Sequence, residues 1–255
     1  MMSDSKTPIS LSEPLLDLGL DSAKSRVLIV GLGKTGLSVA RFLANRGIRF
    51  AVTDSRSQPP MLNELLDQVF DAAVFLGGVD ASAFDVATHV VVSPGVPLDA
   101  PEVQGAIDKG IPLLSDIDLF ACMAQAPVIA ITGSNGKSTV TTLVALMAEA
   151  ACKAVKVGGN LGTPALDLLD DHTELYVLEL SSFQLERTSR LRPLAATVLN
   201  ISPDHMDRYA DMRAYGEAKR RVFEGDGVMV LNADDPMVAA MAVPERTCVR
   251  FGIEM

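Results

Sequence analysis

Two segments of the sequence each run from an apolar strand into a glycine loop and then into a helix. The first is "RVLIV", "GLGKTG" and "LSVARFLANRG", in which Val39, Phe42 and Leu43 recur at helical spacing before Gly47. The second is "PVIAIT", "GSNGKST" and a helix over residues 137–151. Strands that alternate with helices in this way favour a parallel sheet. The repetition therefore predicts two successive α/β units.

Composition agrees with this fold class and limits the partners. The 255 residues can bury two cores, and 48% hydrophobic residues with few aromatics and no Trp fit an α/β protein better than a β sandwich or a disordered chain. The longest apolar runs fall well short of a membrane span. A net charge of -10 argues against a general nucleic-acid or anionic-membrane surface. Any phosphate ligand must therefore be bound by individual groups at its own site and not by a generally basic surface.

The remaining segments complete a doubly wound pattern in each unit. The first unit continues with "RFAVTD", "AAVFLGG", "THVVVSPGV" and "IPLLS", and with a helix over residues 101–109. The second continues with "KAVKVG", "ELYVLEL", "AATVLNI", "GVMVLN" and "TCVRFG", and with a helix over residues 212–223. A capped helix in "SDIDLFACMAQAP" marks the boundary. We predict a leader at 1–25, a Rossmann-like domain at 26–115 and a second α/β domain at 116–255.

The N-terminus and the cysteines are typical of a cytosolic protein. The stretch "MMSDSKTPISLSEPLLDLGLDSAKS" has no basic region followed by an apolar stretch and a cleavage site. We expect a mobile leader with a short helical turn over residues 13–18. Cys122, Cys152 and Cys248 are isolated and odd in number, which predicts reduced thiols with structural roles.

The first glycine loop fits the pattern G-x-G-x-x-G through Gly31, Gly33 and Gly36. Asp54 ends the next strand at about the distance of an acid that binds the ribose of NAD. The glycines would, however, let any nucleotide diphosphate approach the N–H groups at a helix N-terminus. A dinucleotide, another nucleotide diphosphate and a purely structural turn all remain open. The segment "SPG" at 93–95 is either part of the same ligand edge or a simple Pro-Gly turn.

The second glycine loop lacks the first glycine of the standard pattern G-x-x-x-x-G-K-[ST]. Five residues before Gly136 the chain has Ile131. The setting between a strand and a helix is nevertheless right for phosphate. Gly133 and Gly136 can expose N–H groups, Lys137 can neutralise the β and γ oxygens, and Ser138 can offer a hydroxyl to magnesium. We expect a tighter loop in which the neighbouring Thr and Asn side chains share the work.

Three further side chains are candidates for chemistry. Glu179 lies inside an apolar strand, where a carboxylate needs a metal or a cation, so it is either a Mg²⁺ ligand or half of an internal salt bridge. His205 follows a strand among acidic residues, which favours a ligand or substrate contact over a capping role, whereas His89 suits a hydrogen-bonded core position and His172 an exposed loop. By spacing alone, Lys219 belongs to the solvated face of a helix.

Taken together, the motifs resemble those of the Mur ligases. The match runs from about residue 26 to the end, through "GLGKTGLSVARFL", "SPGV", "ITGSNGKSTVTTL", "GGNLGTPAL", "YVLELSSFQLE", "LNISPDHMDRY" and "VLNADD". The loop of that family reads T-G-x-N-G-K-[ST], so the absent glycine is expected there. The resemblance implies three domains, namely a Rossmann-like domain for a UDP substrate, a central ATPase domain and a C-terminal domain for the amino acid.

The resemblance also implies a set of site residues. The UDP portion of the substrate would contact Gly31, Leu32, Gly33, Lys34, Thr35, Gly36, Asp54, Ser55, Arg56, Ser93, Pro94 and Gly95. The muramoyl-alanine end would contact Asn160 and His205. ATP would contact Thr132, Gly133, Ser134, Asn135, Gly136, Lys137, Ser138 and Thr139. Metal ligands would be Ser138, Glu179, His205 and Lys219, the last after carbamylation, and the catalytic residues would be Lys137, His205 and Lys219.

The implied reaction is ATP-dependent acyl-phosphate ligation in the cytoplasm, with Mg²⁺. Within the family the match is closest to enzymes that join D-glutamate to UDP-N-acetylmuramoyl-L-alanine, although another amino acid remains possible. The resemblance further implies a monomer at full length, with neither nucleic acid nor membrane as partner. Such chemistry depends on positioning and charge neutralisation and needs no covalent nucleophile.

The position of "RFGIEM" within the family pattern leads to a further expectation. It falls inside the central domain, before that domain's last strands, a later segment rich in His and Asn, and the C-terminal domain. We expect this chain to bind the UDP substrate without efficient ligation, and to expose apolar edges in a marginally stable second unit. An NAD(P)-linked dehydrogenase and a non-catalytic UDP-sugar-binding fragment are the alternatives.

Overall fold

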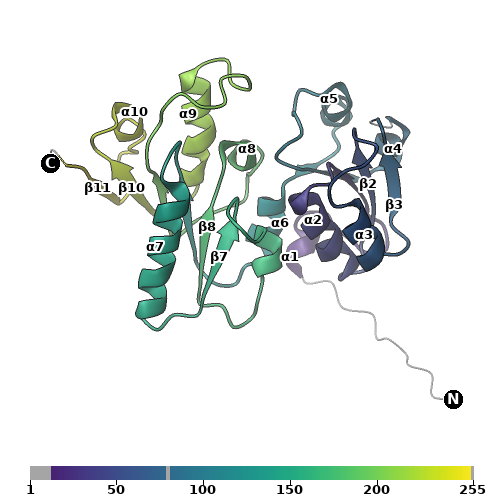
Figure 1. The fold of residues 1–255 in the computed structure, drawn as a ribbon, viewed down its shortest axis with the longest axis horizontal. Helices are drawn as coiled ribbons and strands as arrows, with labels where there is room; N and C mark the ends of the chain where they lie inside the picture. Colours follow the sequence, from purple (N-terminus) through teal and green to yellow (C-terminus); the bar gives the residue numbers. More distant parts are fainter. Residues whose placement is uncertain (1–12, 79–80, 254–255) are drawn as a thin grey trace. The chain divides into compact units, whose positions relative to one another are not determined.

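The chain forms two compact α/β units, which divide between Leu114 and Ser115 (Figure 1). The structure, a computed structural model, describes residues 13–78 and 81–253. All strand pairings within the described sheets are parallel, so the predicted α/β class is confirmed. The division lies one residue from the predicted boundary at 115/116.

The first unit is a five-stranded sheet in the order β3-β2-β1-β4-β5. Its strands are β1 (Arg26–Val30), β2 (Arg49–Asp54), β3 (Ala73–Leu76), β4 (His89–Val92) and β5 (Leu113–Leu114). Its helices are α1 (Glu13–Leu16), α2 (Lys34–Ala44), α3 (Leu62–Gln68), α4 (Ala81–Val86) and α5 (Pro101–Asp108). The chain reaches β3 on one side of β1 and then places β4 on the other side. Ligands of open parallel sheets bind where the strand order reverses in this way, at the carboxyl ends of the strands.

The core of the first unit explains the continuous apolar runs of its central strands. Leu28 and Val30 of β1 pack with Val90 and Val92 of β4, and Phe84 of α4 covers them. Both faces of the sheet are covered by helices in such folds, so strands without polar alternation are expected there.

Residues 13–25 do not form the mobile leader that the sequence predicted. The described part of this segment buries Leu15, Leu18 and Leu20, and the short helix α1 ends two residues before the predicted helical turn does. The carbonyl of Leu18 lies 3.1 Å from His89 Nε2. Apolar burial and this hydrogen bond hold the segment to the first unit. Residues 1–12 of the expected leader lie outside the described residues.

The second unit is a six-stranded sheet in the order β11-β10-β9-β6-β8-β7. Its strands are β6 (Val128–Thr132), β7 (Val155–Gly159), β8 (Leu175–Glu179), β9 (Ala195–Val198), β10 (Val228–Asn232) and β11 (Cys248–Phe251). The order places β6 between β8 and β9, so the segments that follow these three strands leave the sheet at one edge. That edge is the second place where a ligand is expected.

Helices and short turns connect these strands. They are α6 (Asp116–Met123), α7 (Lys137–Ala150), η1 (Ala165–Leu168), α8 (Ser182–Leu185), α9 (Met212–Arg220), η2 (Arg221–Phe223) and α10 (Pro236–Ala239). The predicted helix over 212–223 is therefore α9 followed by a tighter 3₁₀ turn. Helices α3, α4, α8 and α10 were missed, because four to seven residues are too few to show a helical period.

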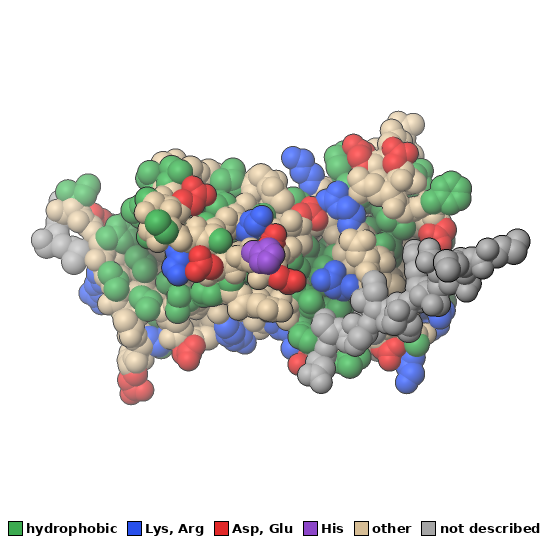
Figure 2. Space-filling model, turned by 90° about the horizontal axis from the view of Figure 1, so that it is seen from below, with side chains coloured by type: hydrophobic (Ala, Val, Ile, Leu, Met, Phe, Trp, Pro, Cys, Tyr) green, Lys and Arg blue, Asp and Glu red, His purple; other side chains and the backbone are tan. Residues whose placement is uncertain are grey.

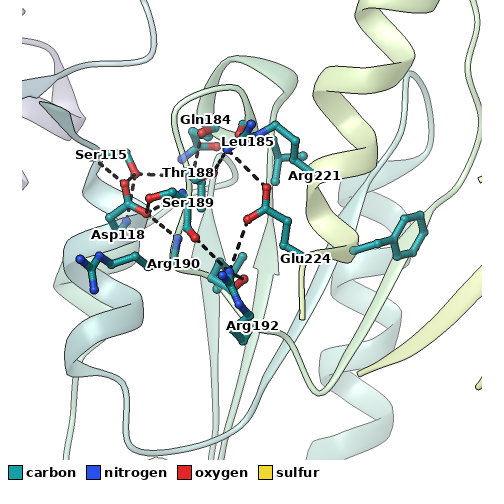
Figure 3. A network of polar contacts seen from close by, with 12 residues as sticks. Ser115, Asp118, Gln184, Leu185, Thr188, Ser189, Arg190, Arg192, Arg221 and Glu224 are labelled. Atoms are coloured by element: carbon teal, nitrogen blue, oxygen red, sulfur yellow. Dashed lines mark hydrogen bonds and ion pairs between the residues drawn. The ribbon is translucent and has the colours of Figure 1, made fainter. Parts of the chain in front are cut away.

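A buried carboxylate attaches α6 to the second unit (Figure 3). Ser115 and Asp118 form a capping box at the start of the helix. The Asp118 carboxylate also accepts hydrogen bonds from the N–H groups of Ser189 at 2.8 Å and Arg190 at 2.9 Å, in the loop that follows α8. The first turn of α6 is thus held by residues more than seventy positions further along the chain.

An apolar groove lies against the second sheet. Helix α7 packs on β6, β7 and β8. Beside it runs an apolar groove whose lining includes Ile131, Val140, Leu199, Val230 and Phe251. Ile131 and Leu199 in this lining are buried, whereas Val249 and Phe251 of the outer strand β11 are 52% and 40% exposed, in line with the expected exposed apolar edge.

Charges of both signs are interspersed on the molecular face that Figure 2 shows. Within the described residues, no helix combines the length and the apolar character that crossing a bilayer requires. None of the three cysteines forms a disulfide.

The first glycine loop supplies a stability prediction. A Cβ at Gly36 would lie 2.1 Å from the carbonyl oxygen of Gly31, whereas a Cβ at Gly33 would meet nothing within 4 Å. We expect Gly36→Ala to destabilise the first unit by at least about 3 kcal/mol, because backbone must move to relieve the clash. Gly33→Ala is the matched control and should change stability by less than about 1 kcal/mol. Urea unfolding with hydrogen exchange of the β1 amides measures both, and equal effects would contradict the prediction.

Candidate functional site

The loop between β6 and α7 presents backbone N–H groups at the start of a helix. Gly136 caps α7 with φ +79°, and Gly133 has φ +151°, so both positions favour glycine. The first N–H groups of α7 have no acceptor within the helix, and the helix dipole adds partial positive charge there. Lys137 Nζ donates to the Ser134 carbonyl at 3.0 Å, which keeps its charge over the loop. The arrangement suits an anion such as phosphate.

The segment that follows β9 holds the β6–α7 loop in shape. The Asn200 side chain accepts from the Asn135 N–H at 2.8 Å and donates to the Asn135 carbonyl at 3.0 Å. The Asn200 carbonyl accepts from the Ser134 N–H at 2.9 Å. Ser202 bonds to the side chains of both Ser134 and Asn135. The loop is therefore stabilised by a neighbouring segment as well as by its own backbone.

This support explains the position of Ile131, where the standard pattern has glycine. Ile131 is a buried ladder residue of β6, paired with Glu179 on one side and Thr197 on the other. The strand continues to Thr132, whose carbonyl accepts from the Leu199 N–H at 2.9 Å. The loop consequently begins later and is shorter, as predicted.

Glu179 stands at the end of β8 and joins the loop to a second glycine turn. Its carboxylate is only 2% exposed, and it accepts from Ser138 Oγ and from Asn160 Nδ2, both at 2.7 Å. A Cβ at Gly158 would lie 2.2 Å from the Thr163 carbonyl, and one at Gly159 would lie 2.4 Å from the Glu179 carbonyl. The first two glycines of "GGNLG" therefore allow the close approach that brings Asn160 to Glu179.

The Glu179 environment fits a magnesium site better than a salt bridge. Among the described residues, its side-chain hydrogen-bond partners are a hydroxyl and an amide, with no ion pair to Lys or Arg. A hydroxyl and a carboxylate beside a phosphate-binding loop are the oxygen ligands that Mg²⁺ prefers. The described residues hold no group of three His, Cys, Asp or Glu side chains around one point, so further ligands would have to come from water, substrate or a modified side chain.

Lys219 is buried directly beneath the loop, which differs from the solvated position that its spacing favoured. It is 1% exposed, and Nζ donates to the Gly133 carbonyl at 2.9 Å and lies 3.4 Å from Thr132 Oγ1. Burial, together with the charge of Lys137, lowers the pKa of Lys219 to about 7, although the charges of Asp204 and Glu179 partly oppose this shift. Helix α9 turns this lysine inward because Tyr215, one turn earlier, is buried on the same face.

His205 lies apart from the Ser138–Glu179 contact in the described structure. Its side chain is 43% exposed, pairs with Asp204 at 3.5 Å and packs its ring against Phe183 with centroids 4.7 Å apart. Its φ of +55° is uncommon for a residue with a side chain and marks local strain. No hydrogen bond or ion pair joins the described His205 side chain to Glu179 or Lys219.

In the first unit, the predicted residues gather at the carboxyl ends of β1, β2 and β4. Ser93 Oγ donates to the Gly31 carbonyl at 2.8 Å, which links the loop after β4 to the loop after β1. Of the other predicted residues of the two loops, Leu32 and Gly36 are buried, whereas Gly33, Lys34, Thr35, Pro94 and Gly95 are half-buried or exposed.

Asp54 has a structural role that the sequence did not reveal. Its buried carboxylate accepts from the Leu32 N–H at 2.7 Å and from the N–H and side chain of Arg56. Burial opposes ionisation, but the hydrogen bonds from Arg56 and Leu32 outweigh it and lower the pKa of Asp54 to about 2. Both oxygens are therefore occupied, which leaves Asp54 poorly placed to bind a ribose. Ser55 and Arg56 are exposed beside it.

Sequence reasoning missed three residues of the second site. Asn200 and Ser202 were quoted within "LNISPDHMDRY" but received no role, and Tyr215, which lies 3.3 Å from Ser134 Oγ, was overlooked. The one available signal was position, because Asn200 and Ser202 follow a strand of the same sheet. Nothing in the helix pattern distinguished Tyr215 from an ordinary core residue.

Family models match both units of the chain. Residues 25–115 match the Mur ligase MurD-like N-terminal domain, and residues 131–255 match the Mur ligase middle domain. A UDP-N-acetylmuramoylalanine–D-glutamate ligase of Methylococcus capsulatus is 60% identical over 236 residues, which are 92% of this chain and 51% of that protein. The protein of the same name from Nitrosococcus oceani is 57% identical over 229 residues, 89% of this chain and 51% of its own length. The chain thus spans about half the length of the curated relatives it matches.

Solved structures share the fold at low sequence identity. A UDP-N-acetylmuramate-alanine ligase from Thermotoga maritima has a TM-score of 0.54 at 20% identity, over 90% of this chain and 53% of that one. A murein peptide ligase from Psychrobacter arcticus has a TM-score of 0.53 at 17% identity, over 89% and 53%. These structures support the arrangement of strands and helices.

The buried lysine supplies a pH prediction. The pKa of Lys219 is about 7 in the folded chain and about 10.4 when unfolded. Between these values the unfolded chain binds one more proton, so the contribution of Lys219 to stability rises with pH. We expect Lys219→Met to lack this rise, so that its stability relative to wild type falls by about 2 kcal/mol between pH 7 and pH 9.

Urea unfolding in buffers freed of carbon dioxide measures this difference. Lys153→Met is the control, because Lys153 is 53% exposed and its ion pair with Glu174 lies at the surface. A Lys219→Met variant whose stability runs parallel to wild type over this range would rule out a lowered pKa.

Proposed function

Because this chain belongs to the Mur ligase family, we propose that it provides the UDP-substrate and ATP sites of a ligase that joins D-glutamate to UDP-N-acetylmuramoyl-L-alanine. The product would be a cytoplasmic precursor of peptidoglycan. Relatives named for this ligation, at 60% and 57% identity, support the choice of substrates. These relatives are about twice as long as the matched region, so formation of the amide bond is proposed for a protein of their full length, acting as a monomer.

The proposed reaction proceeds through an acyl phosphate. The γ-phosphoryl group of ATP passes to the free carboxylate of the UDP substrate, and the amine of D-glutamate then displaces phosphate. The β6–α7 loop, with residues 132–139, would hold the phosphates, and Lys137 would neutralise charge on the transferred group. Positioning and charge neutralisation suffice for this chemistry, so no covalent nucleophile is required.

The contact of Ser138 and Asn160 with the Glu179 carboxylate carries this proposal. Through this contact the buried Glu179 carboxylate lies beside the loop that would hold the triphosphate. Burying a carboxylate without a cation or metal costs free energy, so a bound metal would stabilise Glu179 there. Bound Mg²⁺ would neutralise phosphate oxygens and orient the triphosphate. Ser138 and Glu179 would hold it, with His205 as a further proposed ligand, and Asn160 and His205 would contact the muramoyl-alanine end.

Lys219 is the residue we propose to be carbamylated. Carbamylation needs a neutral amine, and burial of Lys219 together with its lowered pKa favours that form near neutral pH. The added group would turn a cation beneath the loop into an anion able to face a metal. The positive charges of Lys137 and of bound Mg²⁺ would then compensate it.

We propose that the first unit binds the UDP portion of the substrate. The glycine loop supplies N–H groups at the switch point of the sheet, Ser93 holds that loop through the Gly31 carbonyl, and Arg56 adds an exposed cationic side chain. The alternative of an NAD-linked dehydrogenase is less well supported, because both oxygens of Asp54 are engaged by Leu32 and Arg56.

Calorimetric titration distinguishes these ligands. We expect the chain to bind UDP-N-acetylmuramoyl-L-alanine and, more weakly, UDP, because the first unit would recognise the diphosphate and the sugar separately. NAD should neither bind nor compete. Tight NAD binding that UDP does not displace would overturn the assignment.

Nucleotide binding in the second unit should depend on Lys137. We expect Lys137→Met to weaken binding of Mg²⁺-ATP at least tenfold, which is about 1.4 kcal/mol or more, and to leave UDP binding unchanged. Lys153→Met, at an exposed position, is the matched control. If the two lysine variants bind Mg²⁺-ATP equally well, the β6–α7 loop does not bind ATP in the proposed way.

A further inference from the structure

Four rings form an aromatic cluster between α8, α9 and the loop before α9, namely Phe183, His205, Tyr209 and Tyr215. Phe183 stacks with Tyr209 at 6.1 Å between centroids, and Tyr209 lies 5.2 Å from Tyr215. His205 touches both ends, with centroids 4.7 Å from Phe183 and 6.4 Å from Tyr215. The strained backbone of His205 is therefore held by rings on either side.

Tyr215 is the member of this cluster that also reaches the β6–α7 loop. Its hydroxyl lies 3.3 Å from Ser134 Oγ, within hydrogen-bond distance. Its ring lies under the amine of Lys219, with Nζ 4.7 Å from the centroid. One side chain thus contacts the loop, the buried lysine and the cluster that holds His205.

The position of Tyr215 follows from the geometry of α9. Asp211 caps the helix by accepting from the Ala214 N–H at 2.7 Å, which fixes where its first turn begins. Tyr215 and Lys219 are four residues apart and so lie on the same face. Tyr215 is itself 1% exposed, so it can shift little without disturbing its neighbours.

We propose that Tyr215 is a positioning residue. Through Ser134, it fixes the position of the β6–α7 loop relative to Lys219. The hydroxyl orients Ser134, whose main chain and side chain are also bound by Asn200 and Ser202. The ring makes a cation–π contact with the Lys219 amine, which also donates a hydrogen bond to the Gly133 carbonyl. The two actions are separable, because one uses the oxygen and the other uses the ring. The inference rests on the proposed function only where it concerns nucleotide binding.

Two substitutions separate the hydroxyl from the ring. Tyr215→Phe removes only the hydroxyl, and Tyr215→Leu removes both. Tyr176→Phe is the matched control, because Tyr176 is a buried tyrosine of β8 whose hydroxyl bonds to the main chain at Asp170 instead. It reports the general cost of removing a buried hydroxyl.

The ring is tested by NMR of the isotopically labelled chain without nucleotide. The ring current of Tyr215 should shift the ε-methylene protons of Lys219 upfield of those of the other lysines. We expect this shift to persist in Tyr215→Phe and in Tyr176→Phe and to disappear in Tyr215→Leu. Persistence in Tyr215→Leu, or a Lys219 resonance like those of exposed lysines in wild type, would overturn the role of the ring.

The hydroxyl is tested by a double-mutant cycle on Mg²⁺-ATP binding. We expect Tyr215→Phe to weaken binding about three- to tenfold, the range of one neutral hydrogen bond. Adding Ser134→Ala to Tyr215→Phe should weaken binding by less than the product of the two single effects, because both remove the same contact. Effects that multiply fully, or a Tyr215→Phe variant that binds like the Tyr176→Phe control, would overturn the role of the hydroxyl.

The two experiments fail in distinguishable ways. Wild-type chain that does not bind Mg²⁺-ATP would contradict the proposed function, whereas the lysine resonance would still report whether Tyr215 positions Lys219. If Tyr215→Leu does not fold, Tyr215→Phe still tests the hydroxyl by the cycle. The wild-type Lys219 shift in that case tests the ring.

Discussion

The hydrogen bonds between the β6–α7 loop and the segment after β9 are the interaction on which the second site depends. Asn200 makes two hydrogen bonds to the main chain of Asn135, and its carbonyl holds Ser134. These bonds exist because β6 and β9 are adjacent and parallel, so both segments leave the sheet at one edge. A loop supported in this way can begin two residues later than the standard pattern, after Ile131 and Thr132 of β6. The glycine absent at Ile131 is thus compensated by tertiary contacts.

Two charged side chains are buried next to the same loop, Glu179 from β8 and Lys219 from α9. Glu179 and Lys219 are almost fully buried, and burying either charge without polar partners would be costly. Glu179 is stabilised by a hydroxyl and an amide, and Lys219 by a carbonyl and an aromatic face. Such an environment yields an amine with a lowered pKa beside an anion, a combination more typical of functional sites than of structural cores.

The first unit shows that a dinucleotide-binding fingerprint does not by itself identify the ligand. Its glycine spacing and acidic residue fit a dinucleotide-binding loop, but the carboxylate of Asp54 is occupied by donors from Leu32 and Arg56. Arg56 is only two residues from Asp54, so that pairing is local. The Asp54 carboxylate also accepts from the Leu32 N–H, which belongs to another loop. The acid therefore supports the glycine loop itself. A pattern of residue types does not show which donors face a carboxylate.

The sequence by itself determined the alternation of strands and helices, the glycine loops and the position of Lys137, because these depend on contacts within a few residues. It also identified the family, since several motifs occur together in order. It did not reveal that residues 13–25 pack on the first unit or that Asp54 is engaged. The contact of Ser138 with Glu179 spans 41 residues, and that of Lys219 with Gly133 spans 86. Such contacts were decided by strand order and helix rotation in the folded chain, because no local pattern records which distant groups become neighbours.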